Sequence, residues 1–135
     1  MELFEQAIQR LFTKGGFSHN PFRDVPKTGY MVSLKDHEVR ITRETPETER
    51  KELFNVILTA YEGKLSHSPE KYFLGGWLDT ETDDIYLDIS IHIEDLQEAM
   101  NFGREHEQLA IYGIEEKAEI YLSASAFLEI DINLN

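Results

Sequence analysis

Nine residues near the middle of the chain alternate strictly between apolar and polar side chains. The apolar positions are Ile85, Leu87, Ile89, Ile91 and Ile93. A period of two that is rich in β-branched residues predicts a strand with one buried face and one polar face. The preceding segment, 72–78, predicts the partner strand of a hairpin whose turn is 79–84. Its Gly75–Gly76 pair predicts that another backbone or side chain comes close there.

The pattern after this hairpin changes to helical spacing. Asp95 with Glu98 three residues later predicts a capped helix start. The apolar stripe expected on this helix consists of Leu96, Ala99, Met100 and Gly103. Residues 109–114 and 118–122 then predict a second hairpin around the polar turn 115–117.

The first half of the chain predicts a similar succession of elements. Apolar residues repeat at helical spacing within residues 1–14, which predicts an amphipathic N-terminal helix ending at Gly15–Gly16. Two prolines in 17–28 predict an extended linker. Residues 29–43 alternate in two runs separated by the polar segment 35–38, which predicts a hairpin. Thr45 and Pro46 predict the start of a helix that ends at Gly63.

The end of the chain predicts a last strand. Leu128, Ile130, Ile132 and Leu134 alternate with polar residues, among them Glu129 and Asp131, which would face outward. Strands joined by short turns favour an antiparallel sheet covered by helices. We therefore expect one α+β domain spanning 1–135, with a mainly antiparallel sheet of about five to seven strands and two or three helices. A ferredoxin-like order results if each opening hairpin contributes one strand to the sheet centre.

Charge is distributed unevenly along the chain. The 135 residues carry a net charge of −13, and all of it lies in 79–135, where only Arg104 and Lys117 oppose fifteen Asp and Glu residues. Such a segment repels nucleic acid and phospholipid head groups and attracts basic surfaces, although solubility alone also explains it. The carboxylates expected to form a partner-binding surface are Asp88, Glu98, Glu105, Glu129 and Asp131.

Candidate chemistry in the sequence is sparse. The chain has no Cys, so thiolate catalysis and Cys-bound metals are excluded. The acidic turn 79–84 lacks the glycine of a calcium loop, and no two His residues have helical zinc spacing. We expect no catalytic residues, no metal and no cofactor. The alternative site is the polar strand face of Tyr86, Asp88, Ser90 and His92, where a carboxylate could orient an imidazole.

Four segments together resemble a family. GYMVSL at 29–34, YFLGGWLD at 72–79, YLDIS at 86–90 and FGREHEQLAIYGI at 102–114 resemble small acidic proteins encoded by phages and integrative mobile elements of Gram-positive bacteria. The resemblance implies a protein acting in the cytoplasm of a bacterial host. Small acidic proteins in that setting are often inhibitors of host nucleases or restriction systems, and some of them mimic DNA.

The expected function is therefore inhibition of a host nucleic-acid-binding defence protein, of the anti-CRISPR or anti-restriction type. The acidic half would occupy a basic groove, because such a groove reads charge and spacing. The partner would be a basic protein surface, with no direct binding to nucleic acid or membrane. Two alternatives remain open: a small hydrolase or ligand-binding protein using the polar strand face, and a homo-oligomeric structural or regulatory protein in which the last strand pairs across a homodimer.

Overall fold

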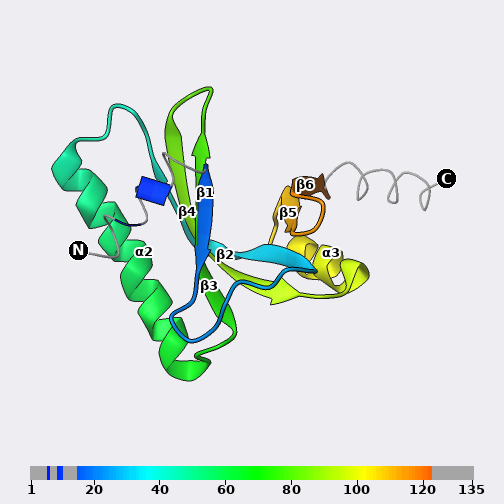
Figure 1. The fold of residues 1–135 in the computed structure, drawn as a ribbon. Helices are drawn as coiled ribbons and strands as arrows, with labels where there is room; N and C mark the ends of the chain where they lie inside the picture. The colour runs from blue at the N-terminus through cyan, green and yellow to red at the C-terminus, as the bar shows by residue number, and fades with distance from the viewer. Residues whose placement is uncertain (1–5, 7–8, 11–14, 123–135) are drawn as a thin grey trace. The chain divides into compact units, whose positions relative to one another are not determined.

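The computed structural model describes residues 6, 9, 10 and 15–122 (Figure 1). Its strands and helices follow one another in the order β1 Gly16–His19, β2 Tyr30–Ile41, α2 Glu47–His67, β3 Tyr72–Asp79, β4 Asp84–Ile93, α3 Leu96–Glu105, β5 Ala110–Gly113 and β6 Ala118–Tyr121. Gln6, Gln9 and Arg10 are also helical. The rest of the predicted N-terminal helix and the predicted last strand, with Glu129 and Asp131, lie outside the described residues.

The six strands form one antiparallel sheet in the order β1-β3-β4-β2-β5-β6. This arrangement confirms the predicted α+β class. The four inner strands with α2 and α3 follow the βαββαβ order, and their neighbours in the sheet are β3-β4-β2-β5. That connectivity is the split βαβ arrangement of ferredoxin-like folds. Strands β1 and β6 extend it at the two edges.

The chain divides into two compact units. Unit 1 comprises Met1–Val25 and Asp36–Ser90, and unit 2 comprises Pro26–Lys35 and Ile91–Asn135. In unit 1, α2 packs on β3 (Figure 1). Its buried residues are Phe54, Ile57 and Tyr61. In unit 2, α3 packs on β5 around a cluster of Val32, Ala99, Ile111 and Leu122. Each core therefore consists of one helix and the apolar positions of nearby strands.

The β3–β4 hairpin confirms the clearest prediction from the sequence. Strand β4 begins one residue before the predicted Ile85 and ends at Ile93. The glycine pair on β3 also has the predicted role. A Cβ at Gly75 would collide with the Asp88 carboxylate, and one at Gly76 would collide with the ring of Phe17. Both positions therefore need the smallest residue.

The predicted hairpin at 29–43 is wrong, because Tyr30–Ile41 forms one continuous strand, β2. The two alternating runs differ in phase, with Val32 and Leu34 buried in the first and Val39 and Ile41 in the second. Between them Asp36 has a φ of 66°, in the left-handed region that Asp tolerates better than most residues. A phase change in a strand pattern indicates either a turn or a local irregularity, and here the strand continues through it.

The segment predicted as a linker, 17–28, begins within a strand. Residues 16–19 form β1, which pairs antiparallel with β3 so that Gly16 lies opposite Trp77 and His19 opposite Leu74. Asn20 follows, and its side-chain amide donates to the carbonyls of Pro69 and Tyr72 at 2.8 Å each. Asn20 is thereby fixed to the segment that leads into β3.

The helix boundaries are partly as predicted. Helix α2 starts at Glu47, but the Thr45 hydroxyl accepts from the Thr42 amide and does not cap the helix. The helix also continues past Gly63 to His67. For α3 the cap is confirmed, since the Asp95 carboxylate accepts from the Glu98 amide at 2.9 Å. Leu96, placed on the buried stripe from the sequence, is exposed, whereas Ala99 and Gly103 are buried.

Candidate functional site

Three of the four residues of the polar strand face belong to unit 1. Tyr86 and Asp88 are half-buried, and Ser90 is buried. The Asp88 carboxylate lies over Gly75 of the neighbouring strand. The polar side of β4 is therefore not the open surface that the alternating pattern alone suggests.

The fourth residue, His92, belongs to unit 2 and contacts the segment that leads into β2. Its Nε2 lies 2.7 Å from the Thr28 carbonyl and 3.1 Å from Glu94 Oε2. The Thr28 hydroxyl donates to the same Glu94 side chain. Gly29, between these groups, has a φ of 85°, and a Cβ there would lie 2.6 Å from His92 Nε2. The imidazole is thus engaged in fixing the entry to β2.

The predicted partner-binding residues separate into three groups. Glu98 and Glu105 are exposed on α3, as expected. Asp88 is half-buried in unit 1, and Glu129 and Asp131 lie outside the described residues. Two of the five carboxylates therefore have the exposure that the hypothesis requires.

A carboxylate group around Tyr30 was missed from the sequence. The Tyr30 hydroxyl lies 3.4 Å from Glu116 Oε2. The pKa of Tyr30 is raised by desolvation and then by the negative charges of Glu116, Glu115 and Asp95. Carboxylates from the start of α3 and from the β5–β6 turn thus act electrostatically on one phenol. No sequence signal pairs these segments, because only the fold of unit 2 brings them together.

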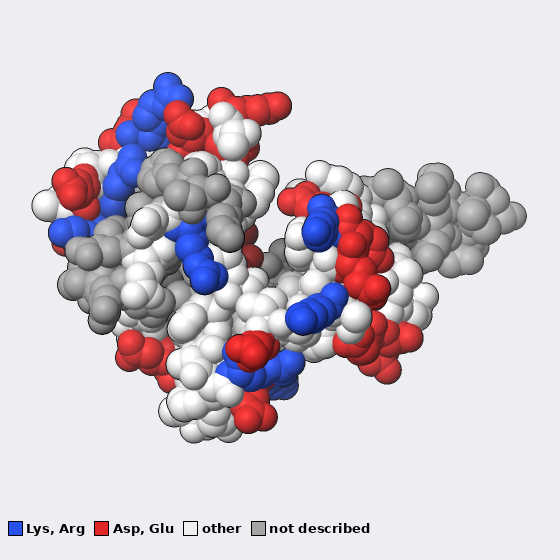
Figure 2. Space-filling view, in the orientation of Figure 1, with Lys and Arg blue, Asp and Glu red and all other residues white. Residues whose placement is uncertain are grey.

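Unit 2 presents these carboxylates to solvent. We call Glu94, Asp95, Glu98, Glu115 and Glu116 the acidic surface of unit 2, and all five are exposed. The Asp95 carboxylate accepts from the Glu98 amide at the start of α3, and the charges of Asp95, Glu115 and Glu116 all act on Tyr30. Figure 2 shows red side chains gathered over the body that carries α3, β5 and β6. Negative charge at a helix start also stabilises the helix itself.

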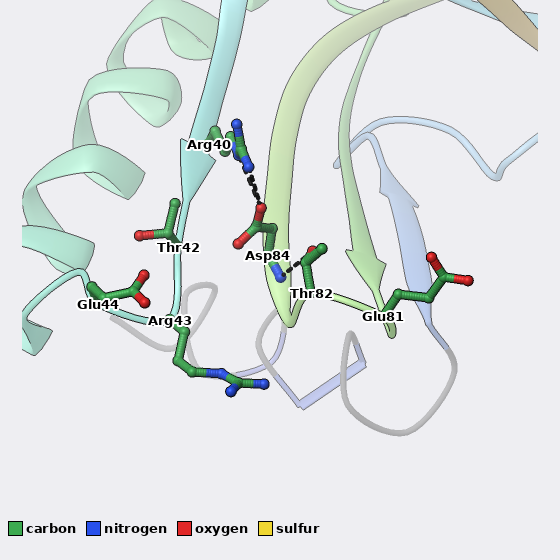
Figure 3. A pocket seen from close by; sticks show the side chains of 7 residues that line it. All are labelled: Arg40, Thr42, Arg43, Glu44, Glu81, Thr82 and Asp84. Carbon is green, nitrogen blue, oxygen red and sulfur yellow. Dashed lines mark hydrogen bonds and ion pairs between the residues drawn. The ribbon is translucent and has the colours of Figure 1, made fainter.

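Unit 1 contains a pocket of about 360 Å³ at the end of β2 and the β3–β4 turn (Figure 3). Arg40 Nε and Nη2 donate to Asp84 Oδ2 at 3.0 and 2.5 Å. The Asp84 side chain is 6% exposed, whereas that of Arg40 is 58% exposed. The hydrogen bond and the charge of Asp84 raise the pKa of Arg40. The full lining is Arg40, Thr42, Arg43, Glu44, Glu81, Thr82 and Asp84.

Aromatic side chains continue from this pocket across the sheet. The guanidinium carbon of Arg40 lies 5.7 Å from the centre of the Tyr86 ring. The Tyr86 ring is 5.4 Å, centre to centre, from that of Trp77, which is 48% exposed. Arg40, Tyr86 and Trp77 come from β2, β4 and β3, which are neighbouring strands. They form a cross-strand row that sequence reasoning did not identify.

Comparison with known proteins supplies no analogue for these features. No family model, curated protein or solved structure matches the chain. Within residues 15–122 no group of three or more His, Asp or Glu side chains is placed to hold a metal ion. No helix in the described part of the chain is long and apolar enough to cross a membrane. Charge, exposure and geometry are therefore the observations that bear on its function.

Proposed function

We propose that this protein is a non-enzymatic interaction module that binds a basic, nucleic-acid-binding surface of a partner protein. The main observation behind this proposal is that every described carboxylate of unit 2 is exposed. Its described acidic residues outnumber its basic ones, Lys27, Lys35, Arg104 and Lys117, by eight to four, and all eight are exposed. Those eight are Glu94, Asp95, Glu98, Glu105, Glu107, Glu115, Glu116 and Glu119.

The arrangement of the charges supports the proposal further. Opposite charges would neutralise the surface locally, as the pair Lys35–Glu107 does at 2.9 Å. Within the acidic surface of unit 2, no Lys or Arg of the described residues pairs with Asp95, Glu98, Glu115 or Glu116, and Glu116 lies 3.4 Å from the Tyr30 hydroxyl. On α3, Glu105 follows Glu98 by two helical turns, about 10 Å along the axis, and extends the negative face. A Lys/Arg-lined groove that normally holds a phosphate backbone is complementary to such a surface.

The resemblance to small acidic proteins of phages and integrative mobile elements supports one class of partner. It favours a host nuclease or its nucleic-acid-binding groove, hence inhibition of the anti-CRISPR or anti-restriction type in a bacterial cytoplasm. This part of the proposal rests on analogy. The hydrolase alternative is less favoured, because His92 is engaged with Thr28 and Glu94 while Asp88 lies over Gly75.

The test uses two charge-matched variants. Glu98→Gln/Glu115→Gln/Glu116→Gln removes three charges from the acidic surface of unit 2. Glu52→Gln/Glu62→Gln/Glu70→Gln removes three exposed charges from unit 1. Both variants have the same net charge, so a difference between them reports the location of the binding surface.

The partner is first captured from bacterial lysate at low salt. The displacement of labelled duplex DNA from this partner by each variant is then measured. The unit 2 variant should bind about 5- to 100-fold more weakly, while the unit 1 variant should stay within about threefold. Binding should weaken steeply as ionic strength passes ~0.15 M, where the screening length is about 8 Å. Equal weakening by both variants, or none by either, would contradict the proposed surface.

A further inference from the structure

We propose that the outer edge of β6 is the docking site of residues 127–134 of the same chain. Within residues 15–122, β6 is an end strand of the sheet and pairs with β5 alone (Figure 1). The inference concerns the sheet of unit 2 and is independent of the proposed function. It assigns the occupant of an interaction surface, and it also determines on which side of the sheet Glu129 and Asp131 lie.

The backbone of β6 presents hydrogen-bonding groups at this edge. The Leu122 amide donates to the Leu109 carbonyl at 2.8 Å, so these two residues form a hydrogen-bonded pair. In an antiparallel ladder such pairs alternate, and the residues between them direct their N–H and C=O groups away from the partner strand. Glu119 and Tyr121 therefore direct these groups to the outer edge. An exposed row of this kind can pair with a further strand, and natural proteins usually cover it.

The side of β6 that faces α3 offers an apolar contact. Ile120 lies opposite Ile111 and packs against the cluster of unit 2, but it is only half-buried. Leu122, on the same side, is buried. Glu119 and Tyr121 are on the other side of the strand, and both are exposed. An added strand with apolar side chains on the α3 side would therefore complete the burial of Ile120.

Residues 127–134 fit this edge in pattern and in position. Their alternate positions are apolar: Leu128, Ile130, Ile132 and Leu134. An extended segment with this pattern has one apolar side and one polar side. The segment follows Leu122 after only residues 123–126, and consecutive strands usually pair or neighbour each other in a sheet. A hairpin loop of three or five residues places the apolar positions on the side of Ile120, and both lengths are common.

Like charges oppose this pairing only weakly. With the apolar positions on the α3 side, the three-residue loop puts Glu129 opposite Glu119, and the five-residue loop puts Asp131 there. The cost of one like-charged cross-strand pair is smaller than the gain from burying several Leu and Ile side chains. Salt screens the repulsion. Docking should therefore not weaken as salt rises, in contrast to the binding of a basic partner.

Docking on this edge separates carboxylates that the sequence suggested for one surface. Glu129 and Asp131 would lie beside Glu119, on the side of the sheet that faces away from α3. Glu98 and Glu105 belong to α3 itself, so they lie on the opposite side. The two pairs of carboxylates could then not contact one flat basic surface together.

The test is disulfide trapping in the full chain, which has no Cys of its own. Two variants place both cysteines on the side that faces away from α3: Tyr121→Cys/Phe127→Cys for the three-residue loop and Tyr121→Cys/Glu129→Cys for the five-residue loop. In each case the pair would be directly opposite, about 5.5 Å between Cα atoms, which is within reach of a disulfide. The matched control is Tyr121→Cys/Leu128→Cys, whose second cysteine would point to the α3 side.

With oxidised glutathione, one of the two same-side variants should form an intrachain disulfide at least about tenfold faster than the control. Mass spectrometry of the unreduced protein identifies the bond, and far-UV circular dichroism checks that each variant is folded. A second measurement is amide exchange. Ile130→Lys should accelerate exchange at Glu119 and Tyr121 at least about tenfold, because it would place a charge beside Ile120. The control Glu129→Gln should change that exchange by less than about threefold.

Equal oxidation rates of all three cysteine variants would overturn the inference, and so would exchange at Glu119 and Tyr121 that Ile130→Lys leaves unchanged. Fastest oxidation of the control would reject the proposed facing of the segment. A disulfide that joins two chains, seen as a dimer on a non-reducing gel, would overturn docking within one chain in favour of strand exchange with a second copy. None of these outcomes involves partner capture, so failure here and failure of the proposed function are distinguishable.

Discussion

Two helical glycines should respond to alanine in opposite directions. Gly63 of α2 is exposed, and a Cβ there meets nothing within 4 Å. Gly103 of α3 is buried, and its Cβ would lie 2.5 Å from Leu122 Cδ1 and 3.0 Å from Ile111 Cγ2. Neither glycine has a positive φ. Alanine is therefore compatible with the backbone at both positions, and only the surroundings differ.

The magnitudes follow from two opposing effects. Alanine in place of glycine in a helix interior stabilises by about 0.8–1.0 kcal/mol, and Gly63→Ala should show this gain. Gly103→Ala gains the same amount but adds a methyl group to a closed cluster, which typically costs about 1–3 kcal/mol. Leu122 and Ile111 are both buried in that cluster, so neither methyl can move into solvent. The net effect at Gly103 should be a loss of about 1 kcal/mol.

The assay is urea unfolding followed by far-UV circular dichroism. With slopes of about 1–3 kcal/mol/M, each change should move the midpoint by roughly 0.3–1 M, upward for Gly63→Ala and downward for Gly103→Ala. Trp77 emission follows unit 1 in the same samples, so separate unfolding of the units would be visible. If Gly103→Ala were as stable as the wild type or more stable, the described packing of α3 on β5 would be refuted.

Three further outcomes are expected. Asp95→Ala should cost about 1 kcal/mol through loss of the α3 cap, whereas Asp95→Asn should keep the cap; equal urea midpoints would contradict the role of the cap. Burial raises the pKa of Tyr61 to about 12; the folded state therefore retains a proton that the unfolded state loses above pH ~10, so stability should fall as pH rises from about 10 to 12. In Tyr61→Phe, stability should decrease less between pH 10 and 12. If the urea midpoint of this variant depended on pH as the wild type does, Tyr61 would not be the group responsible. Gly76→Ala should weaken β1 pairing because Phe17 occupies the space, and amide exchange of residues 16–19 should accelerate; unchanged protection would argue against this contact.

The local sequence pattern was sufficient to predict an element wherever the segment followed a single rule of alternation, capping or turn composition. The strand β4, the hairpin partner β3, the capped start of α3 and the β5–β6 hairpin were all predictable from alternation, capping and turn residues. Even the Gly75–Gly76 pair signalled a close approach. These features depend on residues near one another in sequence, so the sequence carries the information directly.

Prediction failed where a local signal had two physical solutions. The polar residues 35–38 are compatible with either a turn or an irregular strand. In the structure β2 continues through them and pairs with β4 and β5, so they belong to a strand. Gly63 can end a helix, but α2 continues to His67. Leu96 fits a helical stripe, yet it lies in the first turn of α3, where the core does not reach.

The candidate sites divide in the same way. The sequence by itself determined an acidic C-terminal half, the exposure of Glu98 and Glu105 and an alternating β4. Only the tertiary structure placed Glu116 beside Tyr30, brought Tyr30 under the charges of Asp95 and Glu115, and aligned Arg40, Tyr86 and Trp77 across three strands. The physical reason is that charge and periodicity are properties of a segment, whereas a surface or pocket is formed by strand pairing and helix packing between residues far apart in the chain.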